Sequence, residues 1–137
     1  MINHNQASLV IGGQRISLGQ RLVDFEKLGL PDRSRMTSAD TVNIVLQDHA
    51  DWEEPYIVQL GFRGGSLCEF VLFNVDAAND DGANPSLAAD AHARNIARVE
   101  GLFRARHPVS TAWGIADAAV DPKLGLPLIV LRRTTCP

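Results

Sequence analysis

The first third of the chain carries the hydrophobic pattern of a β-hairpin followed by a short helix. In the letters SLVIGGQRIS, apolar and polar residues alternate on both sides of Gly12-Gly13, which can adopt the positive φ angles of a tight two-residue turn. Leu22, Phe25 and Leu28 are then spaced to form one face of a helix. The letters GLP that follow predict where this helix ends, because glycine suits the left-handed position after the last turn and proline cannot continue a helix.

Three strands are predicted in the middle of the chain. They cover the letters TVNIVLQD at 41–48, PYIVQLGF at 55–62 and SLCEFVLFNV at 66–75. The first strand alternates apolar and polar residues, as a strand with one buried face does, and the letters RGG between the second and third form a natural turn. The third strand is apolar on both faces, which indicates a central strand covered on each side or a strand in an interface.

The last part of the chain predicts a long helix and a final hairpin. The letters VDAANDDGANP predict a polar loop, after which Asn84 is a good N-cap and Pro85 a good first helical residue. The helix is expected to run to His107, because Pro108 stops it. Its apolar face is formed by Ala88, His92, Ile96, Val99 and Phe103. The letters STAWGIA and LPLIVLRR then predict two strands joined by a longer loop.

These elements follow one another in the order β-β-α-β-β-β-α-β-β. Because hairpins connect most of the strands and only two helices are expected, the sheet should be mostly antiparallel, which is the pattern of an α+β fold. A chain of 137 residues fits one domain. We therefore predict a single α+β domain over residues 1–137, with about six to seven strands, one short helix and one long helix.

The composition is that of an ordinary globular protein, with 45% hydrophobic and 21% charged residues. No apolar run approaches the roughly 20 residues that cross a bilayer, and the opening MINHNQASLV lacks the basic and apolar regions of a secretory signal. We therefore expect a cytoplasmic protein that does not contact the membrane. Cys68 lies in an apolar run and Cys136 is the penultimate residue, so we predict a buried thiol and a free thiol in the tail in place of a disulfide.

The charge is distributed unevenly, although the net charge is only −3. Residues 36–90 contain ten acidic residues and one basic residue, a balance of −9, whereas residues 91–137 contain seven basic and three acidic residues, a balance of +4. An acidic middle repels nucleic acid, and it attracts a basic protein and accelerates their encounter. The densest part is DHADWEEPY at 48–56, where two aromatic rings lie among four carboxylates, a combination typical of interface anchors. The predicted partner-binding residues are Asp48, Asp51, Trp52, Glu53, Glu54, Tyr56, Asp76, Asp80 and Asp81.

Other interpretations of this acidic segment are open. A solvated connection, with its tryptophan folded back onto the core, also accounts for the letters. His49, Asp51 and Glu53 would share one face of a strand and could bind a divalent metal, but Ala50 and Trp52 do not continue a strand pattern. The letters AANDDGANPSLA lack the first and last ligands of a calcium loop. No metal or cofactor is therefore predicted. No serine or cysteine has the flanks of a nucleophile elbow, which favours a binding protein over an enzyme.

The opening of the chain resembles a module of small bacterial proteins. It consists of a hairpin, a Leu18-Gly19 step, a short helix, and then Leu28-Gly29 with Pro31 and Arg33. Similar openings occur in immunity proteins of polymorphic toxin and contact-dependent growth inhibition systems, and the resemblance covers roughly the first 35 residues. It implies a small, cytoplasmic, acidic antitoxin without a catalytic motif, which covers the active site of a toxin, frequently a basic nuclease. No functional residue is carried over from the resemblance.

Three hypotheses about function follow. The first is a binding protein that neutralises a cognate toxin by covering its active site with an acidic surface. The second is a small enzyme or ligand-binding domain with a pocket between helix and sheet, in which His92, His49 or Arg63 would converge. The third is a structural subunit that oligomerises through an edge strand with the letters LIVLRR.

Overall fold

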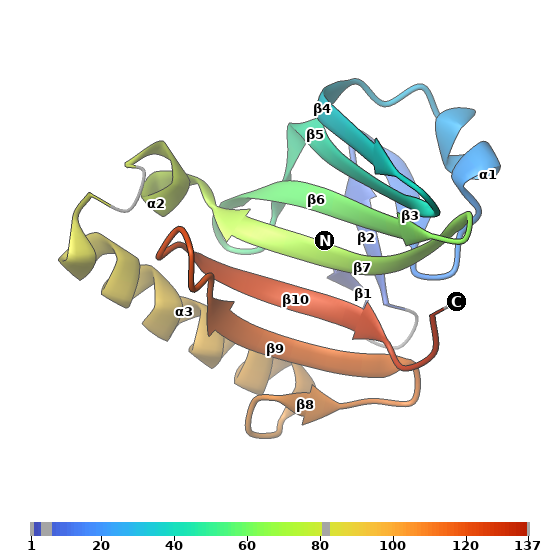
Figure 1. Cartoon of the computed structure of the whole chain (residues 1–137). Coiled ribbons are helices and arrows are strands. Elements are labelled where there is room, and N and C mark those ends of the chain that lie inside the picture. The colour runs from blue at the N-terminus through green and yellow to red at the C-terminus, as the bar shows by residue number, and fades with distance from the viewer. Residues whose placement is uncertain (1, 4–6, 81–82, 137) are drawn as a thin grey trace.

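The hairpin predicted near the N-terminus is present and belongs to a small sheet of its own (Figure 1). The computed structural model describes residues 2–3, 7–80 and 83–136. The small sheet consists of β1 (Ile2–Asn3), β2 (Ser8–Ile11) and β3 (Gln14–Ser17). Gly12 and Gly13 connect β2 to β3 with φ angles of 57° and 77°, the positive values that a tight hairpin turn requires.

The short helix predicted after this hairpin is α1 (Leu22–Glu26). Its ring of Phe25 is buried and lies 5.5 Å from the ring of Phe62, measured between centroids. Gly29 has a φ angle of 69°, so it occupies the left-handed conformation expected after the last helical turn. The helix therefore adds an aromatic side chain to the core, to which the small sheet itself contributes Leu9, Ile11 and Ile16.

The main feature of the fold is a seven-stranded antiparallel sheet with the spatial order β4-β5-β6-β7-β10-β9-β8. Its strands are β4 (Asp32–Ser38), β5 (Thr41–Asp51), β6 (Pro55–Arg63), β7 (Ser66–Asn74), β8 (Val109–Ser110), β9 (Gly114–Val120) and β10 (Pro127–Arg133). The α+β fold class and the mostly antiparallel sheet are confirmed. The strand β7 is the central strand, as its apolar letters predicted.

The two edge strands β4 and β8 were not predicted from the sequence. The letters DRSRMTS of β4 show no buried alternation, because nearly every residue of this strand is exposed. Hydrogen bonds to β5 hold it in place, without a buried side of its own. The strand β8 has only two residues, which is too short for any hydrophobic pattern.

Two helices follow β7, and one of them corrects the prediction of a polar loop. The short helix α2 (Val75–Asn79) occupies the start of that segment, and its residue Ala77 is buried against the rest of the protein. The long helix α3 (Pro85–Phe103) begins as predicted, with the Asn84 side chain accepting hydrogen bonds from the backbone at 86 and 87. It ends at Phe103 and not at His107, because Arg104 adopts a left-handed conformation with a φ angle of 54°. Within the described part of the chain, no helix is long and apolar enough to cross a membrane.

One face of the large sheet carries the whole core (Figure 1). The helix α3 packs against β9 and β10 on this inner face, and the small sheet covers β5 on the same face. Alternate residues such as Leu60, Leu72 and Ile129 point into this layer and are completely buried. The opposite, outer face of the sheet is turned toward the viewer in Figure 1, and the helices do not cover it.

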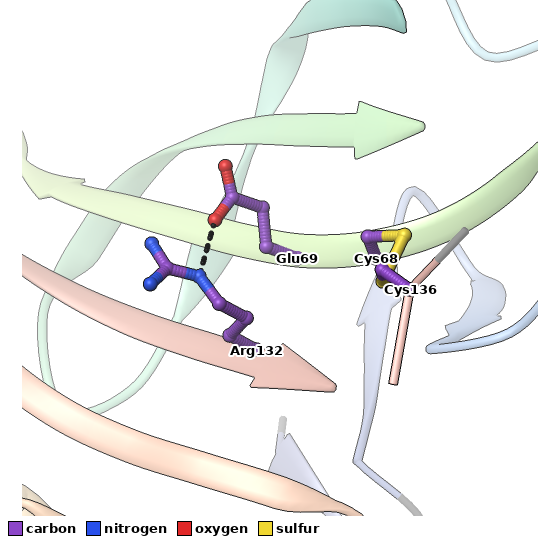
Figure 2. Close-up of a disulfide and its surroundings, with 4 residues drawn as sticks. All are labelled: Cys68, Glu69, Arg132 and Cys136. Carbon is purple, nitrogen blue, oxygen red and sulfur yellow. Dashed lines mark hydrogen bonds and ion pairs between the residues drawn. A yellow bond between two sulfur atoms is a disulfide. The ribbon is translucent and has the colours of Figure 1, made fainter. Parts of the chain in front are cut away.

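The cysteines form a disulfide, which contradicts the prediction of unpaired thiols. Cys68 and Cys136 are bonded across 68 positions of sequence, with their Cα atoms 5.8 Å apart (Figure 2). Sheet topology brings them together, because β10 pairs with β7 so that Arg132 lies opposite Glu69. The tail that follows β10 then runs past the start of β7, where Cys68 lies.

Reduction of this disulfide is expected to lower the free energy of unfolding by about 4 kcal/mol, because the bond closes a long loop and restricts the unfolded chain. Chemical denaturation of the protein with and without a thiol reductant measures the difference. A Cys136→Ala variant is the control, since a reductant should leave its unfolding midpoint unchanged. Equal stability of the oxidised and reduced protein would contradict the expectation.

Candidate functional site

The predicted partner-binding residues lie at one end of the large sheet, but in different environments. Asp48 and Asp51 belong to β5, Trp52, Glu53 and Glu54 form the β5–β6 turn, Tyr56 is on β6, Asp76 is on α2, and Asp80 follows α2. Asp81 lies outside the described residues. Proximity in the sequence therefore translates into proximity in space for most of the set.

The β5–β6 turn separates two consecutive glutamates. Glu53 has a φ angle of 63°, and the backbone NH of Trp52 donates to the carbonyl oxygen of Glu54 at 3.0 Å. This tight turn directs the Glu54 side chain inward, where it is 17% exposed, and leaves the Glu53 side chain 74% exposed. Two adjacent carboxylates thus have different functions in the structure.

The Glu54 carboxylate is the acceptor at the centre of a network of ion pairs. Arg94 binds it in a bidentate manner, with Nε 3.2 Å from Oε1 and Nη2 3.0 Å from Oε2. Arg98 donates from Nη1 to the same Oε1 and from Nε to Glu53 at 3.2 Å. Arg94 also donates to Asp76 at 2.9 Å, so the two arginines of α3 connect the β5–β6 turn to α2.

A buried chain of neutral groups continues this network into the core. The Tyr56 hydroxyl donates to Asn95 Oδ1 at 2.8 Å, and Asn95 Nδ2 donates to Asn74 Oδ1 at 2.7 Å. Asn74 Nδ2 in turn donates to Glu54 Oε1 at 2.8 Å. Tyr56, Asn74 and Asn95 are all 0% exposed. Hydrogen bonds offset the cost of burying these polar groups, because each finds a partner inside the protein.

The electrostatics of the site fix the charge states of its members. Burial raises the pKa of Glu54, but the hydrogen bonds from Arg94 and Arg98 lower it by more, so the net pKa lies below the usual range of a glutamate. Burial raises the pKa of Tyr56, and the nearby Arg98 opposes this only in part. Burial lowers the pKa of Arg98, but hydrogen bonds to Tyr56 and Glu54 raise it above its ordinary value. Glu54 is therefore a carboxylate and Tyr56 a neutral hydroxyl at neutral pH.

These contacts correct the predicted acidic surface. Tyr56 has no exposed area and cannot contact a partner in this conformation. Glu54 and Asp76 carry charges that Arg94 and Arg98 compensate. The charge balance of each segment predicted an uncompensated acidic surface. This prediction was wrong because α3 places its arginines against the acidic turn.

Three predicted carboxylates are exposed along the end of β5 and the β5–β6 turn, and we call them the acidic edge: Asp48, Asp51 and Glu53, of which Glu53 pairs with Arg98. The pairing of β4 with β5 ends at Leu46, so the end of β5 extends past its neighbour. Trp52 lies between these residues, partly buried against the ring of Tyr56 at 6.5 Å. The acidic edge is thus smaller than the sequence suggested, and the network beneath supports it.

A groove of about 400 Å³ opens beside the acidic edge, between the β5–β6 turn and α3. Trp52 and Glu53 form one side, and Ala97 and Gly101 leave space on the helix. His92, His49 and Arg63, the residues expected in a pocket between helix and sheet, do not line it. Among the described residues, no group of three or more histidine, cysteine, aspartate or glutamate side chains is placed to hold a metal ion.

Four residues of the site were not predicted: Asn74, Arg94, Asn95 and Arg98. The predicted apolar face of α3 passed through Ala88 and His92, whereas the residues that are fully buried are Ala91, Asn95 and Val99. Ala91, Asn95 and Val99 are spaced four apart, which is the pattern of a buried helical face. The polar asparagine in the middle made this face hard to recognise from the sequence.

Replacement of Glu54 by glutamine should lower the free energy of unfolding at pH 7 by about 2 kcal/mol, since two arginines lose a charged acceptor. Because the folded-state pKa of Glu54 is lowered, its contribution is complete above the unfolded-state pKa and is lost as the pH falls through the folded value. The difference between wild type and Glu54→Gln should therefore shrink below about pH 4.

Urea denaturation at a series of pH values measures this difference. The matched control is Glu53→Gln in the neighbouring position. The Glu53 side chain is 74% exposed, so this substitution should change the free energy of unfolding little. A difference between Glu54→Gln and wild type that grows on acidification would contradict the assigned charge state.

Comparison of the sequence and the structure with known proteins finds no relative. No family model matches the chain, and neither a curated protein nor a solved structure resembles it significantly. The resemblance of the N-terminal module to immunity proteins stays a prediction.

Proposed function

We propose that this protein is a binding protein that neutralises a cognate toxin, a basic nuclease, by covering its active site. The observation that carries the proposal is the acidic edge on a rigid support. Asp48, Asp51 and Glu53 are exposed at the end of β5, next to an open groove. In the proposed complex, these carboxylates bind where the nuclease binds the phosphate groups of its substrate.

Charge complementarity supports a basic partner. The chain has a net charge of −3, and the acidic edge concentrates three carboxylates within six positions of the sequence. Such a cluster steers an oppositely charged protein and raises the rate of association. Carboxylates paired with arginines, such as Glu54 and Glu53, contribute little to this field, so the steering rests mainly on Asp48 and Asp51.

The groove supports a specific anchor for the partner. The exposed part of Trp52 offers a flat apolar wall, and Glu53 places a carboxylate at the rim. Arg94 and Arg98 also line the groove and Arg98 already pairs with Glu53, so an aromatic or apolar side chain of the partner, packed on the indole, suits the groove better than a cation. An anchor of this kind slows dissociation more than it speeds association.

The network beneath the site supports affinity by preorganisation. Hydrogen bonds from Arg98 to both Glu53 and Glu54 hold the β5–β6 turn in its conformation before any partner arrives. A partner then loses less free energy to the ordering of this turn.

The compartment of this activity is part of the proposal. The expected cytoplasmic location matches a toxin that enters the cell. The Cys68–Cys136 disulfide argues against that location and favours an oxidising compartment, since such bonds are rare where thioredoxin and glutathione keep thiols reduced.

The acidic edge is tested with the toxin domain of a secreted protein encoded next to this chain. Co-expression should rescue cells from that domain, and the purified complex should associate at least about tenfold more slowly at low salt after Asp48→Lys and Asp51→Lys together. Stopped-flow fluorescence measures the rate, and the effect should fall as salt rises.

The matched control is Asp40→Lys with Asp90→Lys, which changes the net charge equally at exposed positions away from the acidic edge. Failure of the chain to protect cells would refute toxin neutralisation. Equal slowing by both pairs of substitutions would show that total charge, and not this edge, drives the encounter.

A further inference from the structure

The outer face of the large sheet contains a hollow far from the acidic edge. It has a volume of about 450 Å³ and lies across β5, β6, β7 and β10. Asn43 of β5, Glu69 of β7 and both cysteines of the Cys68–Cys136 disulfide line it, and Figure 2 shows the disulfide next to Glu69 on β7. The helices pack on the other face of the sheet, so the hollow is open to solvent.

The hollow depends on the absence of a side chain at Gly61. A Cβ atom at this position would lie 2.8 Å from Glu69 Cγ and 3.5 Å from Asn43 Oδ1. Gly61 does not have a positive φ angle, so space and not backbone conformation requires glycine here. A glycine inside a strand weakens it, and in this role it marks a place where another group approaches the backbone closely.

The charge of the hollow is opposite to that of the protein. Arg63 and Arg132 line it together with a single acidic residue, Glu69, which leaves an excess of one positive charge, whereas the guanidinium of Arg133 lies against Gly19. The whole chain carries a net charge of −3. Among the described residues, Arg63 and Arg133 have no carboxylate within ion-pair distance.

One of these arginines is held in position by Glu69. The Nε atom of Arg132 donates to Glu69 Oε2 at 3.0 Å. Figure 2 shows that the two terminal nitrogens of Arg132 point away from this carboxylate, so they keep their donors. A guanidinium fixed through Nε retains the paired donors that match a carboxylate or phosphate group.

We propose that this hollow binds a small molecule carrying a phosphate or carboxylate group. Arg63 and Arg132 hold the anionic oxygens, and Asn43 contributes an amide donor. The hydroxyl groups of Thr41 and Thr134 suit the remaining polar atoms of the ligand. The site lies at the opposite end of β5 from the acidic edge, and it extends beyond the proposed binding of a toxin.

Isothermal titration calorimetry with inorganic phosphate and with citrate tests the proposal and distinguishes the two sources of the anion. Tighter binding of phosphate indicates a phosphorylated ligand, and tighter binding of citrate indicates a carboxylate ligand. Arg63→Gln should weaken the preferred probe about tenfold, whereas Arg33→Gln, an exposed arginine elsewhere, should leave binding unchanged.

A second variant tests the shape of the site independently of charge. Gly61→Ala should displace the Glu69 side chain, which holds Arg132 in position, and weaken binding of the same probe about tenfold, with the fold checked by circular dichroism. The proposal is overturned if neither probe binds at about 10 mM. It is equally overturned if Arg63→Gln and Arg33→Gln weaken binding to the same extent, since the effect would then be one of total charge.

Discussion

The structure depends on one set of contacts, the network that Glu54 organises between the β5–β6 turn and α3. Its ion pairs to Arg94 and Arg98 and its hydrogen bond from Asn74 connect three parts of the chain, the β5–β6 turn, β7 and α3. Removing charged groups from water is costly, and a buried pair often stabilises no more than well-packed apolar residues would. The network is better understood as a constraint on the position of α3, because a shift of this helix would leave buried donors and acceptors unpaired. Tyr56 and Asn95 extend this requirement into the core, where an unpaired hydroxyl or amide would be expensive.

The same network explains how a strongly polarised sequence gives a nearly balanced protein. The acidic middle and the basic last third meet within the structure, where Arg94 lies against both Glu54 and Asp76. Some charges remain unpaired on the surface, and their sign differs from one region to another. Carboxylates remain at the end of β5 near the β5–β6 turn, and arginines remain near the start of that strand. Function is therefore more closely related to the charges that folding leaves unpaired than to the charges of the sequence.

The sequence predicted those elements whose stability is local or follows from regular alternation. Gly12 and Gly13 specify the hairpin turn, and Asn84 specifies the start of α3. The apolar residues on both faces of β7 predict that it is a central strand. The strand β4 was missed because only its partner holds it, and the disulfide was missed because sheet order brings Cys136 back to Cys68. The site was predicted in its acidic half alone. Its arginines belong to α3, 40 or more positions after the glutamates that they bind, and the sequence near the β5–β6 turn contains no pattern that predicts them.

The separation of the two charged features along β5 has a physical consequence. Eight residues separate Asn43 from Asp51, which is roughly 26 Å along an extended strand. Screening in physiological salt acts over about 8 Å, so the field of the acidic edge is weak at the hollow. Among the residues that the structure describes, no network of side chains joins the two places, since the Glu54 contacts lie on the inner face and the hollow on the outer face. Substitutions at one end should therefore act independently of those at the other, as expected for distant sites with no shared partners. A rigid sheet with two such ends can hold a small anion and a basic protein at the same time, because neither ligand needs the residues of the other.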